Sequence, residues 1–330
     1  MKAIIPVAGA GTKLRPHTYT QPKALIPVAG KTILSYIIEQ LADAGVTEFI
    51  LVVGYLGDKI TDYARANYPH LNIAIIHQNE RKGLGHAVYL CKEAVQGDEL
   101  IITLGDTICE YHVEDLLARK ESVLGIKKVD DPREFGVAET DESGTVTRVI
   151  EKPQIPRTNN ALVGIYKIVN SALLFKCIEQ VMQGCGSVED EMGLTPALDC
   201  MIASGEHFGS LKVTNWFDCG KKETLLESNA TLLKKWGSEV NDQENFENTI
   251  IVPPVRIAAG CTISNAIIGP NVTIGEKTTI QYSIVKDSIV GSFTKLYDVV
   301  LNDSIIGSDT EIKGETRTLN IGDNTEIDLG

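Results

Sequence analysis

The feature that most restricts the fold is a six-residue repeat of aliphatic residues in the C-terminal quarter of the chain. After residue 250, isoleucine, valine or leucine recurs at a spacing of six, and a glycine often follows. The groups are Ile257/Ile263, Ile268/Ile274/Ile280, Val290/Leu296, Ile306/Ile312 and Ile321/Ile327. Such hexads are typical of a parallel β-helix, in which each hexad forms one flat face and its aliphatic side chain stacks on the next coil. A β-sandwich of short strands is the alternative, and the recurring period of six disfavours it.

The preceding part of the chain alternates between strand-like and helical patterns. Apolar runs predict strands at 2–7, 48–53, 72–76, 100–104, 122–128, 136–140, 145–151 and 161–168. Helical periodicity predicts helices at 32–44, 56–66, 84–95, 170–182, 190–203 and 221–236. This alternation indicates an α/β fold with a mostly parallel, Rossmann-like sheet. We expect a catalytic domain over 1–236, a polar linker over 237–250 and the β-helix over 251–330.

Composition excludes several classes of protein. The net charge of −13 argues against a nucleic-acid surface, although local cations can still bind small anions. No apolar run is long enough to span a bilayer, and the first residues do not resemble a signal peptide. The seven cysteines contain no CxxC pair, so we expect buried thiols in a reducing cytoplasm rather than a disulfide framework or a zinc site.

Two glycine-containing stretches near the N-terminus could bind phosphate. Gly30-Lys31-Thr32 would need glycine at position 25 to be a P-loop, and that residue is Leu25. The first loop would need glycine at position 14 to be a dinucleotide fingerprint, and that residue is Leu14. A P-loop enzyme and a dehydrogenase are therefore both disfavoured.

The loop after the first strand remains the better phosphate site. Gly9 and Gly11 let the backbone approach a ligand closely, with N–H groups available to phosphate oxygens. Lys13, Arg15 and Lys23 would surround that backbone with positive charge. Any one of these cations could be an ordinary solvated side chain, but three on one loop favour phosphate binding.

At this loop the chain resembles the sugar-1-phosphate nucleotidyltransferases, whose signature is G-x-G-T-R-[LM]-x-P followed by P-K. The resemblance covers the whole chain. The front half, including Gln78–Val88, is similar to UTP–glucose-1-phosphate uridylyltransferases. The back half, including Leu319–Asp323, is similar to the long form of glucose-1-phosphate thymidylyltransferase, which carries a C-terminal left-handed β-helix.

The resemblance implies a set of nucleotide-binding residues: Ala8, Gly9, Gly11, Thr12, Gln78, Gly83 and Asp106. Gln78 and Gly83 fall at the family's spacing for reading a pyrimidine, and a glutamine amide can pair with both a carbonyl and a ring N–H. Asp106 follows a predicted strand, and Asp218 lies in the family's W-x-D-x-G pattern. Together these two acids would hold Mg²⁺, which prefers carboxylate and phosphate oxygens.

The same resemblance implies a sugar site in the E-K-P sequence. Glu151 would accept hydrogen bonds from sugar hydroxyls, and Lys152 would bind the sugar phosphate. Gly136 and Gly164 would offer backbone contacts to the hexose. The alternative is that Glu151 and Lys152 lie in solvent at the end of a strand and bind no ligand.

These parts imply a reaction in which a sugar 1-phosphate attacks the α-phosphorus of dTTP or UTP and pyrophosphate leaves. Lys13, Arg15, Lys23 and Lys152 would be the catalytic cations. Position 13 departs from the family, which usually has arginine there, and lysine loses the two-pronged donor. That departure keeps open a non-catalytic sensor of nucleotide sugars. A guanylyltransferase using GTP and mannose 1-phosphate is a further alternative.

The β-helix carries a last alternative, an acyltransferase. Such enzymes typically use a histidine base, and all six histidines precede residue 237. We therefore expect the β-helix to be structural and to build a homo-oligomer. The sequence does not distinguish dTTP from UTP, because the methyl group of thymine changes no hydrogen bond.

Overall fold

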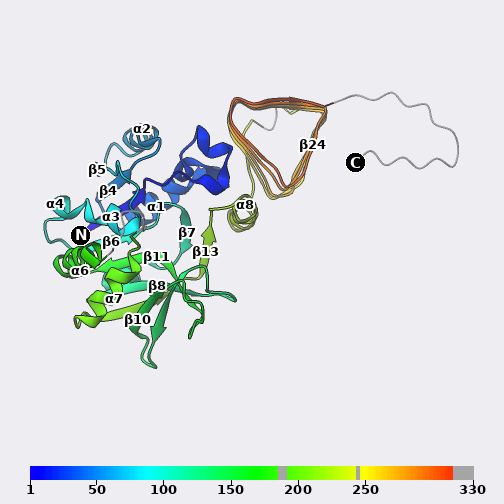
Figure 1. The fold of residues 1–330 in the computed structure, drawn as a ribbon. Helices are drawn as coiled ribbons and strands as arrows, with labels where there is room; N and C mark the ends of the chain where they lie inside the picture. Colours follow the sequence, from blue (N-terminus) through cyan, green and yellow to red (C-terminus); the bar gives the residue numbers. More distant parts are fainter. Residues whose placement is uncertain (185–191, 243–245, 315–330) are drawn as a thin grey trace. The chain divides into compact units, whose positions relative to one another are not determined.

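The computed structural model describes residues 1–184, 192–242 and 246–314 (Figure 1). The chain divides into two compact units, Met1–Ser228 and Asn229–Gly330, and each is described by itself. Among the described residues, no helix is both long and apolar enough to cross a membrane.

The first unit is built on a nine-stranded sheet with the order β5-β4-β1-β6-β11-β8-β12-β10-β9. Its strands are β1 (Lys2–Val7), β4 (Glu48–Val53), β5 (Asn72–His77), β6 (Leu100–Thr103), β8 (Ser122–Lys128), β9 (Gly136–Thr140), β10 (Thr145–Glu151), β11 (Asn160–Ile168) and β12 (Phe208–Lys212). The strands β5, β4, β1 and β6 run parallel, which the apolar runs predicted. β11 is antiparallel to both β6 and β8, so the sheet as a whole is mixed.

Helices follow the strands of this sheet closely. They are α1 (Ile33–Asp43), α2 (Gly57–Asn67), α3 (Leu84–Tyr89), α4 (Lys92–Val95), α5 (Val113–Ala118), α6 (Ser171–Gly184), α7 (Thr195–Ala203) and α8 (Lys222–Trp236). The helix expected over 84–95 is divided in two, because the N–H of Cys91 bonds to the carbonyl of Val88 and tightens the turn. The helix expected from 190 begins at Thr195, next to Pro196, and residues 190 and 191 lie outside the described ranges.

The main core lies between this sheet and helices of the first unit. Ile4, Val52 and Ile102 from the strands belong to one buried cluster with Leu174 of α6 and Leu198 of α7. Central strands that are buried on both faces contain almost only apolar residues, which explains the runs KAIIPV and EFILVV.

The Gly30-Lys31-Thr32 stretch is a turn followed by the short strand β3 (Lys31–Thr32), which leads directly into α1, and is not a phosphate loop. The Thr32 hydroxyl accepts a hydrogen bond from the backbone N–H of Ser35 at 3.0 Å and caps α1. Lys31 is exposed and its ammonium lies 2.6 Å from Glu39 Oε2. The sequence argument against a P-loop is therefore supported by the local structure.

The second unit is a parallel β-helix with a triangular cross-section (Figure 1). One sheet has the order β14-β16-β19-β22-β25, a second β15-β18-β21-β24 and a third β17-β20-β23-β26. The strands are β14 (Glu239–Val240), β15 (Ile250–Ile251), β16 (Val255–Ile257), β17 (Thr262–Ser264), β18 (Ile267–Ile268), β19 (Val272–Ile274), β20 (Thr279–Gln281), β21 (Ile284–Val285), β22 (Ile289–Val290), β23 (Lys295–Tyr297), β24 (Val300–Leu301), β25 (Ile305–Ile306) and β26 (Glu311–Lys313). Parallel pairing along every sheet confirms the β-helix and overturns the sandwich alternative.

The hexad residues stack inside this helix. Ile263 pairs with Ile280, Ile280 with Leu296 and Leu296 with Ile312, so the coils are 17, 16 and 16 residues long. A glycine in the hexad has a steric reason at Gly275, where a Cβ would lie 2.5 Å from the backbone nitrogen of Ser292 on the next coil. Ile321, Ile327 and the Leu319–Asp323 motif lie outside the described residues.

The segment expected to be a linker contributes to the second unit. Within it, β14 pairs in parallel with β16, and Glu247 bridges to Ser264. The boundary between the compact units falls between Ser228 and Asn229, inside α8. The division into 1–236, 237–250 and 251–330 stays a prediction about independent domains.

Candidate active site

The loop after β1 folds back on itself through Gly11. This residue has φ +58°, and a Cβ there would lie 2.9 Å from Cγ2 of Thr18. The Thr18 hydroxyl donates to the Gly11 carbonyl at 2.8 Å, which holds the turn. Gly9 has open space around its Cα, so a ligand can approach its backbone. The loop therefore turns at Gly11 and leaves open space at Gly9.

A cavity of about 650 Å³ opens at this loop. Its walls come from the carboxyl ends of β1 and β6, the loop after β5 and the segment after Asp218. It brings together ten of the residues predicted from the sequence: Ala8, Gly9, Gly11, Thr12, Lys13, Lys23, Gln78, Gly83, Asp106 and Asp218. This volume lies in the usual range for small-ligand sites, which are most often found at such strand ends.

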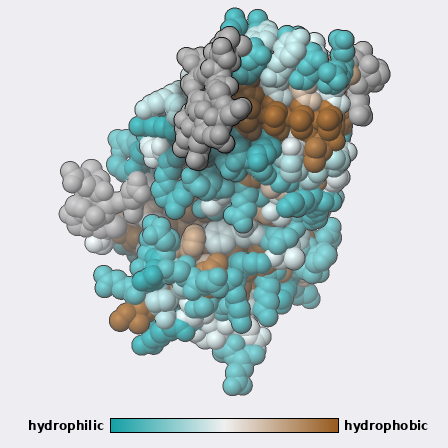
Figure 2. Space-filling model, turned by 90° about the vertical axis from the view of Figure 1, so that its right-hand side faces the viewer, coloured by the Kyte–Doolittle hydropathy of each residue, from teal (hydrophilic) through white to brown (hydrophobic). Residues whose placement is uncertain are grey.

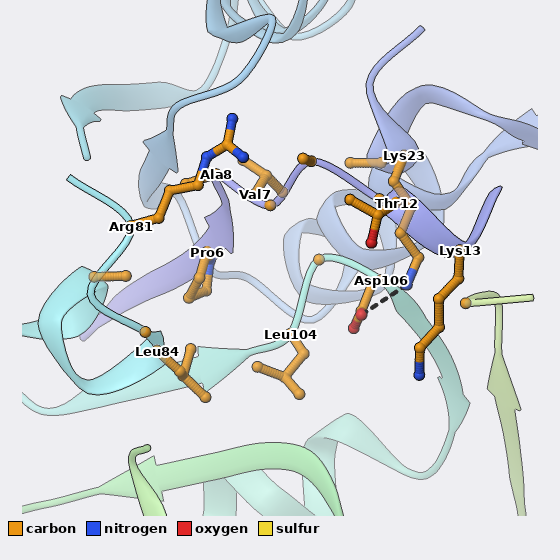
Figure 3. Close-up of a pocket in the computed structure, with 18 of the residues that line it drawn as sticks. Pro6, Val7, Ala8, Thr12, Lys13, Lys23, Arg81, Leu84, Leu104 and Asp106 are labelled. Carbon is orange, nitrogen blue, oxygen red and sulfur yellow. Dashed lines mark hydrogen bonds and ion pairs between the residues drawn. The ribbon is translucent and has the colours of Figure 1, made fainter. Parts of the chain in front are cut away.

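Positive side chains lie on two sides of the cavity (Figure 3). Lys13 and Lys23 extend in the same direction from the first loop, and Arg81 lies on the opposite side. Leu84 and Leu104 add an apolar wall. The arrangement suits a ligand with several negative charges at one end and a flat apolar group.

A two-stranded ribbon, which the sequence patterns did not predict, brings the two aspartates together. β7 (Thr107–Glu110) and β13 (Asn215–Asp218) pair antiparallel, with Asp218 opposite Thr107. The backbone N–H of Cys219 also donates to the carbonyl of Asp106 at 3.3 Å. The ribbon thus places Asp106 and Asp218 side by side although 112 positions separate them in the sequence.

The aspartates have defined partners within the protein. The Lys23 ammonium lies 2.7 Å from Asp106 Oδ2 (Figure 3). The Gly220 N–H donates to Asp218 Oδ1 at 2.9 Å. A Cβ on Gly220 would lie 3.4 Å from the Lys23 ammonium, so this cation is close to both acids.

This donor set fits Mg²⁺. Each aspartate keeps a carboxylate oxygen beyond the contacts above, and Mg²⁺ is commonly held by one or two carboxylates together with phosphate oxygens and water. Within residues 1–184, 192–242 and 246–314, no group of three or more His, Cys, Asp or Glu side chains could hold a metal ion without such added ligands. Asp106 and Asp218 would therefore bind the metal together with the substrate.

Gln78 is buried at the cavity wall with its amide held in one orientation. Its Nε2 donates to the carbonyl of Gly83 at 3.0 Å and contacts Nδ1 of His86 at 3.1 Å. A carbonyl can only accept, so the contact with Gly83 must be made by the NH₂ group and the amide cannot be flipped. Both amide hydrogens are thereby used, and the carbonyl oxygen of Gln78 is the part available to a ligand.

His86 must be neutral for this arrangement. Its Nδ1 accepts from Gln78, so the ring proton is on Nε2. Burial, followed by the nearby charge of Lys82, lowers the pKa of His86, while Glu80 opposes the shift. The ring therefore stays an acceptor at neutral pH.

Gly83 is required where the loop crosses the chain before α7. It has φ +89°, and a Cβ would lie 2.5 Å from the carbonyl oxygen of Met192. The N–H of Gly85 donates to that same carbonyl at 2.8 Å. The close approach of Met192 therefore explains the glycine independently of any ligand.

The four residues predicted for the sugar do not line the cavity. Glu151 lies opposite Gly136 on β10 and β9, and its Oε2 accepts from the hydroxyl of Thr195 at 2.6 Å. Lys152 has φ +41°, an unfavourable value for a residue with a side chain, of the kind that clusters at functional sites. Gly164 has φ +82°, and a Cβ there would lie 2.4 Å from Leu104, which lines the cavity.

Three cations differ from the sequence expectation. The guanidinium of Arg15 lies 4.9 Å from the centre of the Tyr19 ring and does not line the cavity. Arg81 and Lys221 do line it, although neither was predicted as a site residue. The sequence signature for phosphate binding covers only the first loop. Arg81 becomes a candidate because the sheet places the loop after β5 at the same cavity as the first loop.

Comparison with known proteins agrees with this geometry. A family model described as nucleotidyl transferase matches residues 2–235. The chain belongs to this nucleotidyl transferase family.

Several relatives resemble this nucleotidyl transferase over most of its length. It is 33% identical to the low-salt glycan biosynthesis nucleotidyltransferase Agl11 of Haloferax volcanii, with all of both chains covered. It is 31% identical to a glucose-1-phosphate thymidylyltransferase of Streptomyces griseus, over 88% of this chain and 87% of the relative. The crystal structure of a UDP-glucose pyrophosphorylase complexed with UDP-glucose shares the fold, with a TM-score of 0.63, 23% identity and coverage of 71% of this chain and 98% of that one.

In the described part of the chain, the two cysteines nearest to Asp106 and Asp218 in the sequence, Cys109 and Cys219, are not activated thiols. Cys219 directly follows Asp218 and is fully buried. Burial raises the pKa of its thiol to about 12, and the same holds for Cys109 on β7. Neither cysteine is a nucleophile at neutral pH.

Proposed function

We propose that the enzyme transfers a nucleotidyl group from dTTP or UTP to a hexose 1-phosphate, most simply glucose 1-phosphate. An oxygen of the sugar phosphate forms a bond to the α-phosphorus, the bond from that phosphorus to the bridging oxygen breaks, and pyrophosphate leaves with the electron pair. The observation that carries this proposal is the cavity in which Lys13, Lys23, Asp106 and Asp218 meet beside the buried amide of Gln78. The name of the Streptomyces griseus relative, a glucose-1-phosphate thymidylyltransferase, supports the same class of substrates, and the name of the Haloferax volcanii relative supports nucleotidyl transfer.

The orientation of Gln78 supports a base with a ring N–H. Because both amide hydrogens are engaged, its carbonyl oxygen would accept a hydrogen bond from N3–H of uracil or thymine. The pairing with a base carbonyl, which the sequence also suggested, would then fall to backbone N–H groups. Cytosine has an acceptor at the same ring position and would leave two acceptors facing each other.

The cations would align two phosphate esters that repel each other. Lys13 and Lys23 would face the triphosphate, Lys152 would bind the attacking phosphate, and Glu151 would accept from a sugar hydroxyl. Mg²⁺, held by Asp106 and Asp218, would stabilise charge on the transferring and leaving phosphates. Arg81 would add positive charge on the far side of the cavity, while the position of Arg15 against Tyr19 makes it a weaker candidate. An ionised phosphate oxygen needs no general base.

The proposal is tested by pyrophosphate release with each nucleotide in turn. The complete chain is mixed with Mg²⁺, glucose 1-phosphate and dTTP, UTP, GTP or CTP, and mannose 1-phosphate replaces glucose 1-phosphate in a second series. We expect dTTP or UTP with glucose 1-phosphate to exceed CTP at least hundredfold in kcat/KM, and EDTA to stop release. Highest activity with GTP and mannose 1-phosphate would support the guanylyltransferase instead.

Two further outcomes would contradict the proposal. Binding of a nucleotide sugar without pyrophosphate release from any pair would support the sensor. Product from an acyl-CoA would support the acyltransferase. We also propose that the enzyme is cytoplasmic and a homo-oligomer, as the sequence led us to expect.

A further inference from the structure

Arg81 differs from the lysines of the first loop in its place at the cavity. Lys13 and Lys23 extend from the first loop, and the Lys23 ammonium is ion-paired with Asp106. Arg81 lies on the opposite side, on the loop after β5 (Figure 3). Gln78 begins that same loop, and its carbonyl oxygen is the part available to a base. Arg81 is therefore a cation at the base end of the cavity and not at the phosphate end.

An aromatic ring holds the guanidinium of Arg81. Its Cζ lies 5.5 Å from the centre of the Tyr55 ring. Among the residues that the structure describes, no carboxylate forms an ion pair with Arg81, although the adjacent Lys82 pairs with Glu80. The contact with a ring face uses no acceptor atom, so it does not occupy the N–H donors of the guanidinium. Arg81 thus has a defined place and keeps donors for a ligand.

Tyr55 is itself fixed from two directions. Its hydroxyl donates to the carbonyl of Tyr19 at 3.1 Å, and its backbone N–H donates to the carbonyl of Ala8 at 3.4 Å. The residue is half-buried between β4 and α2 and does not line the cavity. The ring is therefore suited to orient Arg81 without touching a bound nucleotide.

Uracil and thymine present three polar groups in a row along one edge. The ring N–H at position 3 lies between the carbonyls at positions 2 and 4, so the edge alternates acceptor, donor and acceptor. The Gln78 oxygen would serve the N–H, which leaves two carbonyls that each need a donor. A backbone N–H can serve one of them. Arginine has five N–H donors and no acceptor, so Arg81 suits the other.

The side on which Arg81 lies favours the carbonyl at position 4. The carbonyl at position 2 is next to the ribose, which connects the base to the phosphates. The carbonyl at position 4 is on the part of the base farther from the ribose. Arg81 lies opposite Lys13 and Lys23, the two cations that face the triphosphate in the proposed function.

We infer that Arg81 determines base specificity by donating a hydrogen bond to the carbonyl at position 4 of uracil or thymine, and that the Tyr55 ring positions it. Cytosine has an amino group at position 4, which would place a donor against a donor. Guanine has an amino group on one side of its ring N–H, so one of the two protein donors would again meet a donor. The inference rests on the proposed function, because it assumes a uracil or thymine nucleotide in this cavity.

Sulfur-substituted nucleotides test this contact, because sulfur accepts hydrogen bonds more weakly than oxygen. Calorimetry measures the binding of UTP, 4-thio-UTP and 2-thio-UTP to the complete chain with Mg²⁺ and without a sugar phosphate, so no turnover is needed. The wild type should bind 4-thio-UTP at least about fivefold more weakly than UTP. Arg81→Met keeps a long side chain without a donor. It should bind UTP about tenfold more weakly than the wild type does, and it should bind UTP and 4-thio-UTP within about twofold of each other.

Two further sets of variants make the test specific. Arg65→Met, on the exposed side of α2 and outside the cavity lining, is the matched control and should bind all three nucleotides as the wild type does. Tyr55→Leu should weaken UTP binding about threefold in the wild type and not further in Arg81→Met, because the ring acts through Arg81. Tyr55→Phe keeps the ring and should keep the preference for UTP over 4-thio-UTP. The thermal midpoint shows whether each variant is folded.

The outcomes separate this inference from the proposed function. An equal preference for UTP over 4-thio-UTP in the wild type and in folded Arg81→Met would overturn the inference and leave the proposed function standing. A preference over 2-thio-UTP that disappears in Arg81→Met would overturn the assignment to position 4. Failure of the wild type to bind both UTP and dTTP would overturn the proposed function and the inference with it.

Discussion

At the scale of single residues, the candidate site depends on side chains whose polar atoms are held by the protein before any ligand arrives. Gln78 is held by the Gly83 carbonyl and by His86, and Asp218 is held by the N–H of Gly220. Fixed donors and acceptors cost little reorganisation when a substrate binds. Substitutions that keep one hydrogen bond while changing charge or protonation can separate function from folding at these positions.

Asp218→Asn should abolish turnover without unfolding the enzyme. Asparagine keeps an oxygen that accepts from Gly220 but loses the charge needed for a divalent cation. We expect kcat to fall at least about a hundredfold, or about 2.7 kcal/mol, in a pyrophosphate-release assay, with an unchanged thermal midpoint. Asp199→Asn is the matched control, because Asp199 Oδ1 accepts from the N–H of Val149 away from the cavity. Near-normal activity of Asp218→Asn would disprove its assignment as a metal ligand.

His86 should act as a positioning residue for Gln78. Protonation of His86 would place its Nδ1–H against the NH₂ group of Gln78 and break their hydrogen bond. Nucleotide affinity should therefore have its full value above the lowered pKa of His86 and fall as the pH drops through it. In His86→Asn, the Oδ1 atom can stand where Nδ1 stood and cannot be protonated, so KM for the nucleotide should lose this pH dependence. His86→Leu removes the acceptor and should raise KM about tenfold at pH 7.5, the equivalent of one hydrogen bond. Identical pH profiles of KM for the wild type and His86→Asn would exclude this role.

At the scale of elements, connections determine which residues meet. The β7–β13 ribbon joins the two aspartates, and the loop between β5 and α3 places Gln78, Gly83 and Arg81 at the cavity. That loop is anchored by reciprocal backbone bonds, from Met192 N–H to the Lys82 carbonyl and from Gly85 N–H to the Met192 carbonyl. The loop is therefore held in one conformation, and Gly83 is needed because a larger residue would clash with Met192.

Gly83→Ala should be more destabilising than a glycine substitution with a similar φ and free space. Gly97 has φ +85° with nothing within 4 Å of its Cβ position, so Gly97→Ala should cost only the strain of a positive φ, about 1 kcal/mol. Gly83 combines φ +89° with ψ −179°, a conformation that only glycine adopts readily, and Gly83→Ala adds the clash with Met192, so it should cost about 2–4 kcal/mol. Thermal unfolding of both variants compares them, and only Gly83→Ala should also weaken nucleotide binding. Equal midpoints would mean that the loop moves aside without cost.

At the scale of the whole molecule, the described cavity is lined by residues from Pro6 to Lys221, all of which belong to the first unit. We therefore expect a substitution at an exposed outward position of the β-helix to leave the chemistry of the first unit unchanged. Such positions exist on the sheet β15-β18-β21-β24, where Ile250, Ile284 and Val300 are exposed and hydrophobic side chains form a row on the surface (Figure 2).

Turnover should not depend on the exposed side chains of the β-helix. Val300 is 72% exposed, so Val300→Glu should keep kcat within about twofold of the wild type, a difference of about 0.4 kcal/mol or less. Pyrophosphate release by both proteins at equal enzyme concentration provides the comparison. A larger loss of kcat in the folded variant would indicate that this part of the β-helix contributes to the site.

The sequence by itself determined the class of fold, the β-helix and ten of the residues that line the cavity. A hydrophobic period of six or of two indicates which side chains face a core. Glycine at positions 11 and 83 indicates a backbone conformation and a close contact that a larger residue would not tolerate. These are local constraints, written in neighbouring residues. Only the tertiary structure decided that Asp106 meets Asp218 through an antiparallel ribbon, that Arg81 enters the cavity while Arg15 turns to Tyr19, and that one face of the β-helix stays uncovered. Each of these depends on the pairing of distant segments, and long-range pairing is selected by the free energy of the whole packed core rather than by any short stretch of chain.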